Sequence, residues 1–262
     1  MNVERPRVLA AVTWAYLAWS LVPVAYAVRA AISATGGTRP EGFSLEPFRF
    51  ALRDEETVAA LGQSVKLALI TAAIAVPLGT SIALGLRHLP GRGWRWVGAG
   101  LLAGIAMPSI VLAMILLYLF AFVVKIGLST QAQVVAHSTL AIPFVTLVIL
   151  LRLASFEEHV EEQAFDLGAP PNDVVTRLLL PMLGPAIVVA AVVAFTISFN
   201  DLVLSRALCF PNECHTIPML LYGGRGADDP SPAQFALAVL SVALSTALLA
   251  AGAYALARRR AR

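Results

Sequence analysis

His137 is the only side chain titrating near neutral pH inside the long uncharged stretches of this 262-residue chain, and Ser138 follows it directly. A serine beside a histidine has the residue types of a nucleophile and its base. Adjacent helical residues project about 100° apart, however, so these two side chains do not face each other. An ionisable group within a membrane segment is a functional candidate by default. A hydrogen bond from His137 to a neighbouring helix is nevertheless the favoured interpretation.

The two cysteines, Cys209 and Cys214, lie five positions apart. In an oxidising compartment they would form a disulfide that closes a loop. A metal site made of Cys209, Cys214 and His215 is one alternative, but it has no fourth ligand nearby and lacks the spacing of a zinc module. Two unpaired thiols are the other alternative. The sequence favours the disulfide and no metal.

Six uncharged stretches must position these residues. Charged residues make up 13% of the chain, well below the ~25% of soluble proteins. Each stretch has at least 20 residues, enough for a helix to cross ~30 Å of hydrocarbon. Because a bilayer offers no water to free backbone groups, we predict an all-α membrane protein with six transmembrane helices. The stretches are residues 8–28, 67–86, 96–124, 126–151, 178–200 and 230–257.

The basic residues predict the orientation of the chain. With both termini on one side, that side holds 11 of the 19 Lys and Arg residues, at about twice the density of the other side. Cytoplasmic loops carry such an excess, so both termini are placed in the cytoplasm of a multi-pass inner or plasma membrane protein. The basic tail, residues 256–262, would contact anionic headgroups. A net charge of +3 without a long basic run disfavours nucleic-acid binding.

The first uncharged stretch also has features of a cleaved signal peptide. Arg5 and Arg7 precede it, and residues 25–27 read Ala-Tyr-Ala, the small residues of a cleavage site. The apolar run is long for a signal peptide and contains Trp14 and Trp19. A retained first helix is therefore the favoured interpretation.

Each of the first four uncharged stretches contains a proline in its interior. A proline lacks the backbone donor and its ring crowds the preceding turn, so bends are expected at these positions. We interpret each of them as architectural. They are Pro23, Pro77, Pro108 and Pro143.

The segment from Arg152 to Pro181 is too charged and too regular for a passive connector. Ser155 and Glu158 have the spacing of a capping box at a helix start. Apolar residues then recur at helical spacing, which predicts an amphipathic helix whose apolar stripe needs a partner. These residues are Phe156, Val160, Ala164 and Leu167.

A second helix is expected after an elbow. Gly168 would end the first helix, because glycine suits the residue after a helix terminus. Pro170 and Pro171 suit the start of the second helix, which would continue to Pro181.

This segment resembles the EAA signature of type I ABC importer permeases. Gln163 stands where the family usually has alanine, and Leu178 replaces a common isoleucine. Residues 63–68, 77–79 and 107–111 are similar to further family segments, so the resemblance covers about residues 57–255. The residues that match the signature are Glu162, Ala164, Gly168, Leu180 and Pro181.

The resemblance implies a type I ABC importer transmembrane domain at residues 57–255, with a coupling loop at residues 155–181. Residues 1–56 would form an N-terminal helix and the first extracytoplasmic loop, and residues 256–262 a basic cytoplasmic tail. Two such permeases would form the solute path, two ATPase subunits would bind them, and an extracytoplasmic binding protein would deliver solute.

Each residue of the coupling loop has an implied role. Glu162 would meet basic or donor groups of the ATPase, and Gly168 would permit the elbow. Val160, Ala164 and Leu167 would supply contact area. The chain would be no enzyme and would bind no cofactor: it has no GxxxxGK[ST] loop, so ATP and Mg would belong to the ATPase.

A narrower resemblance concerns the solute. Residues 194–201 and 216–222 are similar to the polyamine-type subgroup, which implies a spermidine- or putrescine-like solute and favours a heterodimer of permeases. Asn200 and Asp201 are candidates for the solute path, because a carboxylate attracts a cation at low local dielectric. Asp201 could instead cap a helix or pair with Arg206. Another solute, such as a sugar, an amino-acid derivative or a metal, stays open.

An ion-coupled secondary carrier is the alternative class. Such carriers are expected to have ionisable groups or broken helices at mid-membrane, and His137 is the one ionisable candidate. An intramembrane hydrolase is disfavoured further, since the chain has no GxSxG or HExxH motif.

Overall fold

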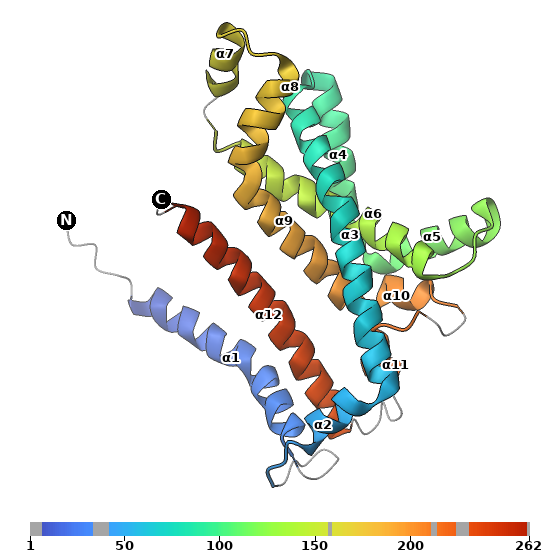
Figure 1. Ribbon diagram of the computed structural model, residues 1–262. Coiled ribbons are helices and arrows are strands. Elements are labelled where there is room, and N and C mark those ends of the chain that lie inside the picture. The colour runs from blue at the N-terminus through green and yellow to red at the C-terminus, as the bar shows by residue number, and fades with distance from the viewer. Residues whose placement is uncertain (1–6, 34–41, 157–158, 211–213, 224–230, 261–262) are drawn as a thin grey trace. The chain divides into compact units, whose positions relative to one another are not determined.

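The structure, a computed structural model, describes residues 7–33, 42–156, 159–210, 214–223 and 231–260 (Figure 1). All regular elements within these ranges are helical, which confirms the all-α prediction. The elements are α1 (Arg7–Ala31), α2 (Glu46–Arg53), α3 (Glu55–His88), α4 (Gly91–Ala106), α5 (Ser109–Tyr118), η1 (Leu119–Val124), α6 (Thr130–Leu153), α7 (His159–Asp166), α8 (Pro171–Asp173), η2 (Val174–Leu179), α9 (Leu180–Asn200), α10 (Val203–Ala207), α11 (Ile217–Gly223) and α12 (Pro232–Arg260).

Five helices of the described chain are long and apolar enough to cross a membrane. A bent pair, Gly91–Ala106 with Ser109–Val124, passes the same test as a unit. The predicted six spans are therefore reached when this pair counts as one. The five single helices are Leu9–Ala31, Glu55–His88, Thr130–Leu153, Pro171–Asn200 and Pro232–Gly252.

The third predicted span, residues 96–124, is not one straight helix. α4 and the α5–η1 pair meet with a bend of 103°. Met107 is extended at the bend, with ψ at 122°, because the ring of a following proline disfavours the helical conformation. The bend expected at Pro108 is confirmed. The other three prolines lie within helices that continue past them: Pro23, Pro77 and Pro143.

The chain divides into two compact units. The first contains Met1–Val58 and Leu220–Leu244, and the second contains Ala59–Met219 and Ser245–Arg262. In the first unit, the rings of Tyr26 and Phe235 pack edge to face with centroids 6.0 Å apart. The predicted boundaries were 1–56, 57–255 and 256–262. The main difference is that residues 220–244 belong to the first compact unit, whereas the prediction placed them in the domain 57–255. Those boundaries stay a prediction.

Small side chains build the core of the second unit, in which α6 and α9 are in extensive contact. In a bilayer, helices associate through van der Waals packing, and small residues let their backbones approach closely. A Cβ added to Gly79 of α3 would lie 2.6 Å from Cγ1 of Val145 in α6, so these helices are nearly in backbone contact. The buried core residues are Ala75, Ala83, Ala141, Val145, Ile149, Leu153, Leu183, Ala186, Ala190 and Ala194.

Candidate functional site

The coupling loop (residues 155–181) contains the predicted elbow. α7 ends at Asp166, and Gly168 follows with a φ of +80°. This left-handed conformation is open to glycine without strain, and it turns the chain sharply. The backbone N–H of Ala169 donates to the carbonyl of Ala164 at 3.0 Å, which satisfies a free acceptor at the end of α7.

The start of α7 differs from the prediction. Ser155 Oγ donates to the carbonyl of Arg152 at 2.7 Å, so it completes the end of α6. A serine hydroxyl can bond backwards in this way as readily as it can cap a following helix. The described part of α7 begins at His159, and Phe156 is not helical. The predicted helix start at Ser155 is wrong, and Glu158 of the proposed capping box lies outside the described residues.

The second helix of the loop is continuous with the fifth span. α8, η2 and α9 form one helix, Pro171–Asn200. Leu180 and Pro181 directly follow the π-helical segment η2. Its wider turn makes room for the ring of Pro181, which has no N–H and would crowd a regular helix. The Leu-Pro pair of the signature therefore lies within a helix that leads into the membrane.

The predicted ATPase-contacting residues of α7 and the elbow differ in exposure. Val160 and Ala164 are half-buried within this chain. Leu167 has 87% of its surface exposed, and Glu162 is exposed as well. Glu162 and Leu167 are thus accessible to another protein, whereas Val160 and Ala164 are covered in part by their own chain.

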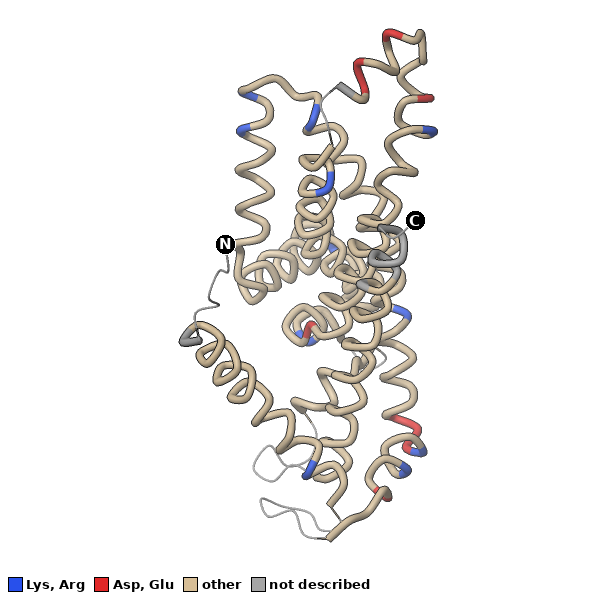
Figure 2. Tube along the Cα trace, turned by 90° about the vertical axis from the view of Figure 1, so that its left-hand side faces the viewer, with Lys and Arg blue, Asp and Glu red and all other residues tan. Residues whose placement is uncertain are grey.

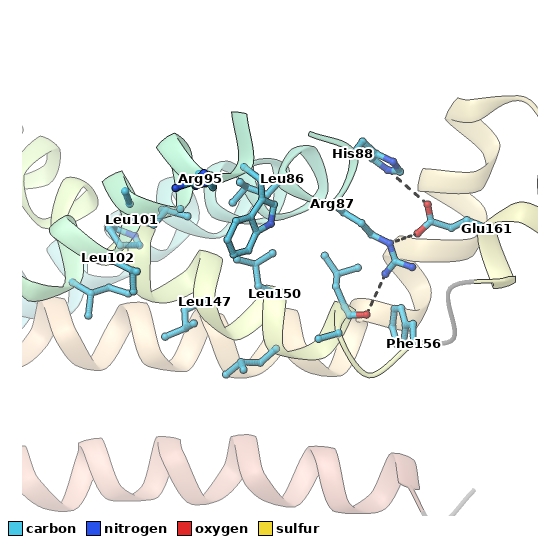
Figure 3. A pocket seen from close by; sticks show the side chains of 18 of the residues that line it. Leu86, Arg87, His88, Arg95, Leu101, Leu102, Leu147, Leu150, Phe156 and Glu161 are labelled. Carbon is cyan, nitrogen blue, oxygen red and sulfur yellow. Dashed lines mark hydrogen bonds and ion pairs between the residues drawn. The ribbon is translucent and has the colours of Figure 1, made fainter. Parts of the chain in front are cut away.

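An ion pair that the sequence analysis missed connects α7 to the spans. Arg87, near the end of α3, places its Nε 2.8 Å from Oε1 of the buried Glu161 (Figure 3). Nη1 of the same guanidinium donates to the carbonyl of Leu153 at the end of α6, at 3.1 Å. Nε2 of His88 lies 3.6 Å from the other oxygen of Glu161. One arginine therefore holds together α3, α6 and α7.

A cavity of about 1010 Å³ adjoins this ion pair, between α4, α6 and α7 (Figure 3). Its walls are mainly apolar side chains of α4 and α6, and Glu161 and Glu162 contribute from α7. The helix that carries the signature is therefore part of the cavity wall. The apolar lining includes Trp94, Leu101, Leu102, Leu147, Leu150 and Phe156.

Asn200 and Asp201 lie where α9 ends. Nδ2 of Asn200 donates to the carbonyl of Thr196 at 2.9 Å and to Oγ of Ser245 at 3.2 Å. Oδ1 of Asp201 accepts the backbone N–H of Leu204 at 2.7 Å, so Asp201 caps α10. Burial raises the pKa of the Asp201 carboxyl, while its backbone hydrogen bonds lower it. The structure therefore has the capping arrangement that the sequence left open.

Cys209 and Cys214 are joined by a disulfide, with Sγ atoms 2.06 Å apart. A disulfide sulfur carries no thiolate, so neither cysteine is available as a metal ligand in this state. Among the described residues, no three His, Cys, Asp or Glu side chains are grouped as metal ligands would be.

Comparisons with known proteins identify the family. Residues 75–262 match the family described as "Binding-protein-dependent transport system inner membrane component". The chain is 31% identical over 209 residues to the spermidine/putrescine transport system permease protein PotC of Haemophilus influenzae, covering 80% of each chain. It is 34% identical over 187 residues to the putrescine transport system permease protein PotI of Escherichia coli, covering 69% of this chain and 66% of that one.

A solved structure shares the fold. It is a bacterial ABC transporter involved in the import of the acidic polysaccharide alginate, at a TM-score of 0.75 and 16% sequence identity. The match covers 98% of this chain and 97% of that one. Together with the matches to PotC and PotI, this establishes that the chain belongs to the binding-protein-dependent transport inner membrane components and is a multi-pass permease subunit of an ABC importer.

Proposed function

We propose that the coupling loop of this permease docks into a cytoplasmic ATPase and that the chain forms half of the translocation path. The exposure of Glu162 and Leu167 beside the Gly168 elbow carries this proposal. Figure 2 shows acidic residues along the segment that contains α7, and basic residues on neighbouring helices at the same end of the second unit. An acidic and apolar surface outside the spans suits a protein partner.

ATP binding would act through this contact. Closure of two ATPase subunits on ATP would draw together the coupling loops of two permeases and switch the path from inward-facing to outward-facing. Such a switch is a rigid-body motion driven by the differential affinity of a ligand for two states. ATP and Mg would be bound by the ATPase, and this chain would bind no cofactor and catalyse no reaction. Both termini would lie on the cytoplasmic side with the coupling loop.

The proposed solute is a polyamine or a similar small cation. The names of the PotC and PotI relatives support this class, and a heterodimer with a second permease is the favoured assembly. An extracytoplasmic binding protein would select the solute and deliver it. Asn200 and Asp201 are the proposed residues of the solute path, with one Asp201 oxygen engaged in capping α10.

Purification of this chain in mild detergent, with mass spectrometry of the co-eluting proteins, tests the proposed assembly. Recovery of an ATPase and a second permease is the expected result. A panel of spermidine, putrescine, maltose and amino acids would then be offered to the co-eluting binding protein. Purification without an ATPase, under conditions that preserve a known importer complex, would contradict the coupling role. A binding protein that prefers a sugar would remove the polyamine assignment alone.

Replacing Glu162 with glutamine is expected to reduce substrate-stimulated ATP hydrolysis by roughly tenfold, since a charge-assisted hydrogen bond contributes about 1.5–3 kcal/mol. The measurement is the ATPase rate of the reconstituted complex with loaded binding protein. Asp166→Asn is the matched control, because Asp166 is an exposed acidic residue one turn further along α7. Equal losses in both variants would show a general charge effect and remove Glu162 from the docking site.

A further inference from the structure

Two fully buried polar side chains of α6, Gln133 and His137, lie one helical turn apart near the start of that helix. Both bind the chain that follows α9, here called the Asp201 segment (residues 201–210 and 214–216). Nε2 of Gln133 donates to the carbonyl of Ser205 at 3.0 Å and to that of Cys214 at 3.3 Å. One side chain therefore joins α6 to α10 and to the disulfide.

His137 makes a second connection between the same elements. Its Nδ1 lies 2.9 Å from Oγ of Ser198 in α9, and its Nε2 lies 3.2 Å from Oγ of Ser205 in α10. The hydrogen bond to a neighbouring helix expected for His137 is thus confirmed. Oγ of Ser198 donates to Oγ1 of Thr71 in α3 at 3.3 Å, so the contact extends to a third span.

The hydroxyl of Ser205 fixes the role of one ring nitrogen. Ser205 Oγ has a single proton, which it donates to the carbonyl of Asp201 at 2.9 Å. It therefore accepts from Nε2–H of His137, which is the donor at this contact.

The opposite end of α6 is held as well. Arg87 donates to the carbonyl of Leu153 at this end and pairs with Glu161 of α7. α6 thus contacts the coupling loop region at one terminus and the Asp201 segment at the other, within one unit of the structure. A helix is stiff along its axis, so a displacement at one end is carried to the other.

We infer that His137 and Gln133 are positioning residues of the transport cycle, which make the Asp201 segment move together with α6 when the coupling loop moves. The inference rests on the proposed function. In an apolar interior a polar group without a hydrogen-bond partner is unfavourable. These hydrogen bonds therefore hold the Asp201 segment in one position against α6. An apolar contact of the same size would allow the Asp201 segment to slide along α6.

Two substitutions of His137 separate the two contacts. The amide of glutamine reaches about as far as Nε2, so His137→Gln keeps a donor for Ser205. The amide of asparagine reaches about as far as Nδ1, so His137→Asn keeps only the contact with Ser198. Thr146→Val is the control, because Thr146 is a buried residue of α6 whose hydroxyl bonds only within its own helix, to Ile142.

The first measurement is the number of solute molecules transported per ATP hydrolysed by the complex in proteoliposomes, with loaded binding protein. His137→Asn is expected to lower this ratio about tenfold, the effect of losing a buried hydrogen bond. His137→Gln and Thr146→Val are expected to stay within about twofold, because both keep the hydrogen bond between residue 137 and Ser205. A merely structural role would lower the yield of intact complex and leave the ratio unchanged.

Amide hydrogen exchange of residues 203–208 is the second measurement. Exchange is expected to rise in His137→Asn and to stay unchanged in His137→Gln and Thr146→Val. A wild-type ratio in His137→Asn, or an equal loss in the glutamine and asparagine variants, would overturn the inference. If the wild-type complex itself shows no ATP-driven transport, the proposed function fails. The exchange measurement does not require transport. Unchanged exchange in His137→Asn would therefore overturn the proposed connection between α6 and the Asp201 segment even in that case.

Discussion

Replacing Arg87 with methionine is expected to lower the thermal unfolding midpoint of the purified complex by roughly 6–10 °C, because breaking a buried ion pair from one side costs about 3 kcal/mol or more. The substitution leaves the Glu161 carboxylate, whose side chain is only 9% exposed, without its closest cation. It also removes the link that Arg87 makes between α7 and the carbonyl of Leu153 at the end of α6. Substrate-stimulated ATP hydrolysis is therefore expected to fall close to the basal rate.

The double variant Arg87→Met, Glu161→Leu separates stability from coupling. Removing both charges leaves no unpaired carboxylate, so most of the lost stability is expected to return. Coupling is expected to stay low, since the connection between α7 and the spans is still absent. Arg92→Met, at an exposed arginine near the start of α4, is the control and should resemble wild type. A wild-type ATPase rate in the single variant would show that this connection is not needed.

The sequence predicted the helices because the bilayer restricts the possibilities. A long uncharged stretch has to be helical, and each of the six stretches overlaps a candidate spanning helix or the bent pair. The amplitude of a bend depends on whether neighbouring groups replace the missing hydrogen bond. Pro108 opens a bend of 103°, while helix α6 continues past Pro143. Nothing in the sequence distinguishes these two prolines.

The coupling loop was predictable to the extent that its signals are local. A glycine after an amphipathic helix indicates an elbow, and Gly168 has the positive φ that such an elbow requires. Ser155 misled the prediction, since its hydroxyl can bond in either direction along the chain. The Arg87–Glu161 pair was missed because its partners are far apart in the sequence. Glu161 stands beside Glu162, and only the fold shows which of the two is buried.

Replacing Gly168 with valine is expected to reduce recovery of the ATPase in a pull-down at least about tenfold, because a β-branched residue at positive φ is strained by roughly 1–3 kcal/mol. A Cβ at this position would meet no atom within 4 Å, so the effect is one of backbone conformation and not of crowding. The elbow would relax toward a negative φ and turn Glu162 and Leu167 away from the ATPase.

Gly168→Asn is the graded control, since asparagine tolerates the left-handed conformation better than other non-glycine residues. Its recovery of ATPase is expected to lie between those of wild type and Gly168→Val. Membrane insertion, measured by the yield of the chain in the membrane fraction, should be equal in all three proteins, because Gly168 lies outside the spans. If valine and asparagine released the ATPase equally, any side chain at this position would block docking. The contact surface of the ATPase would then have to include residue 168 itself, and the positive φ would not be the feature that matters.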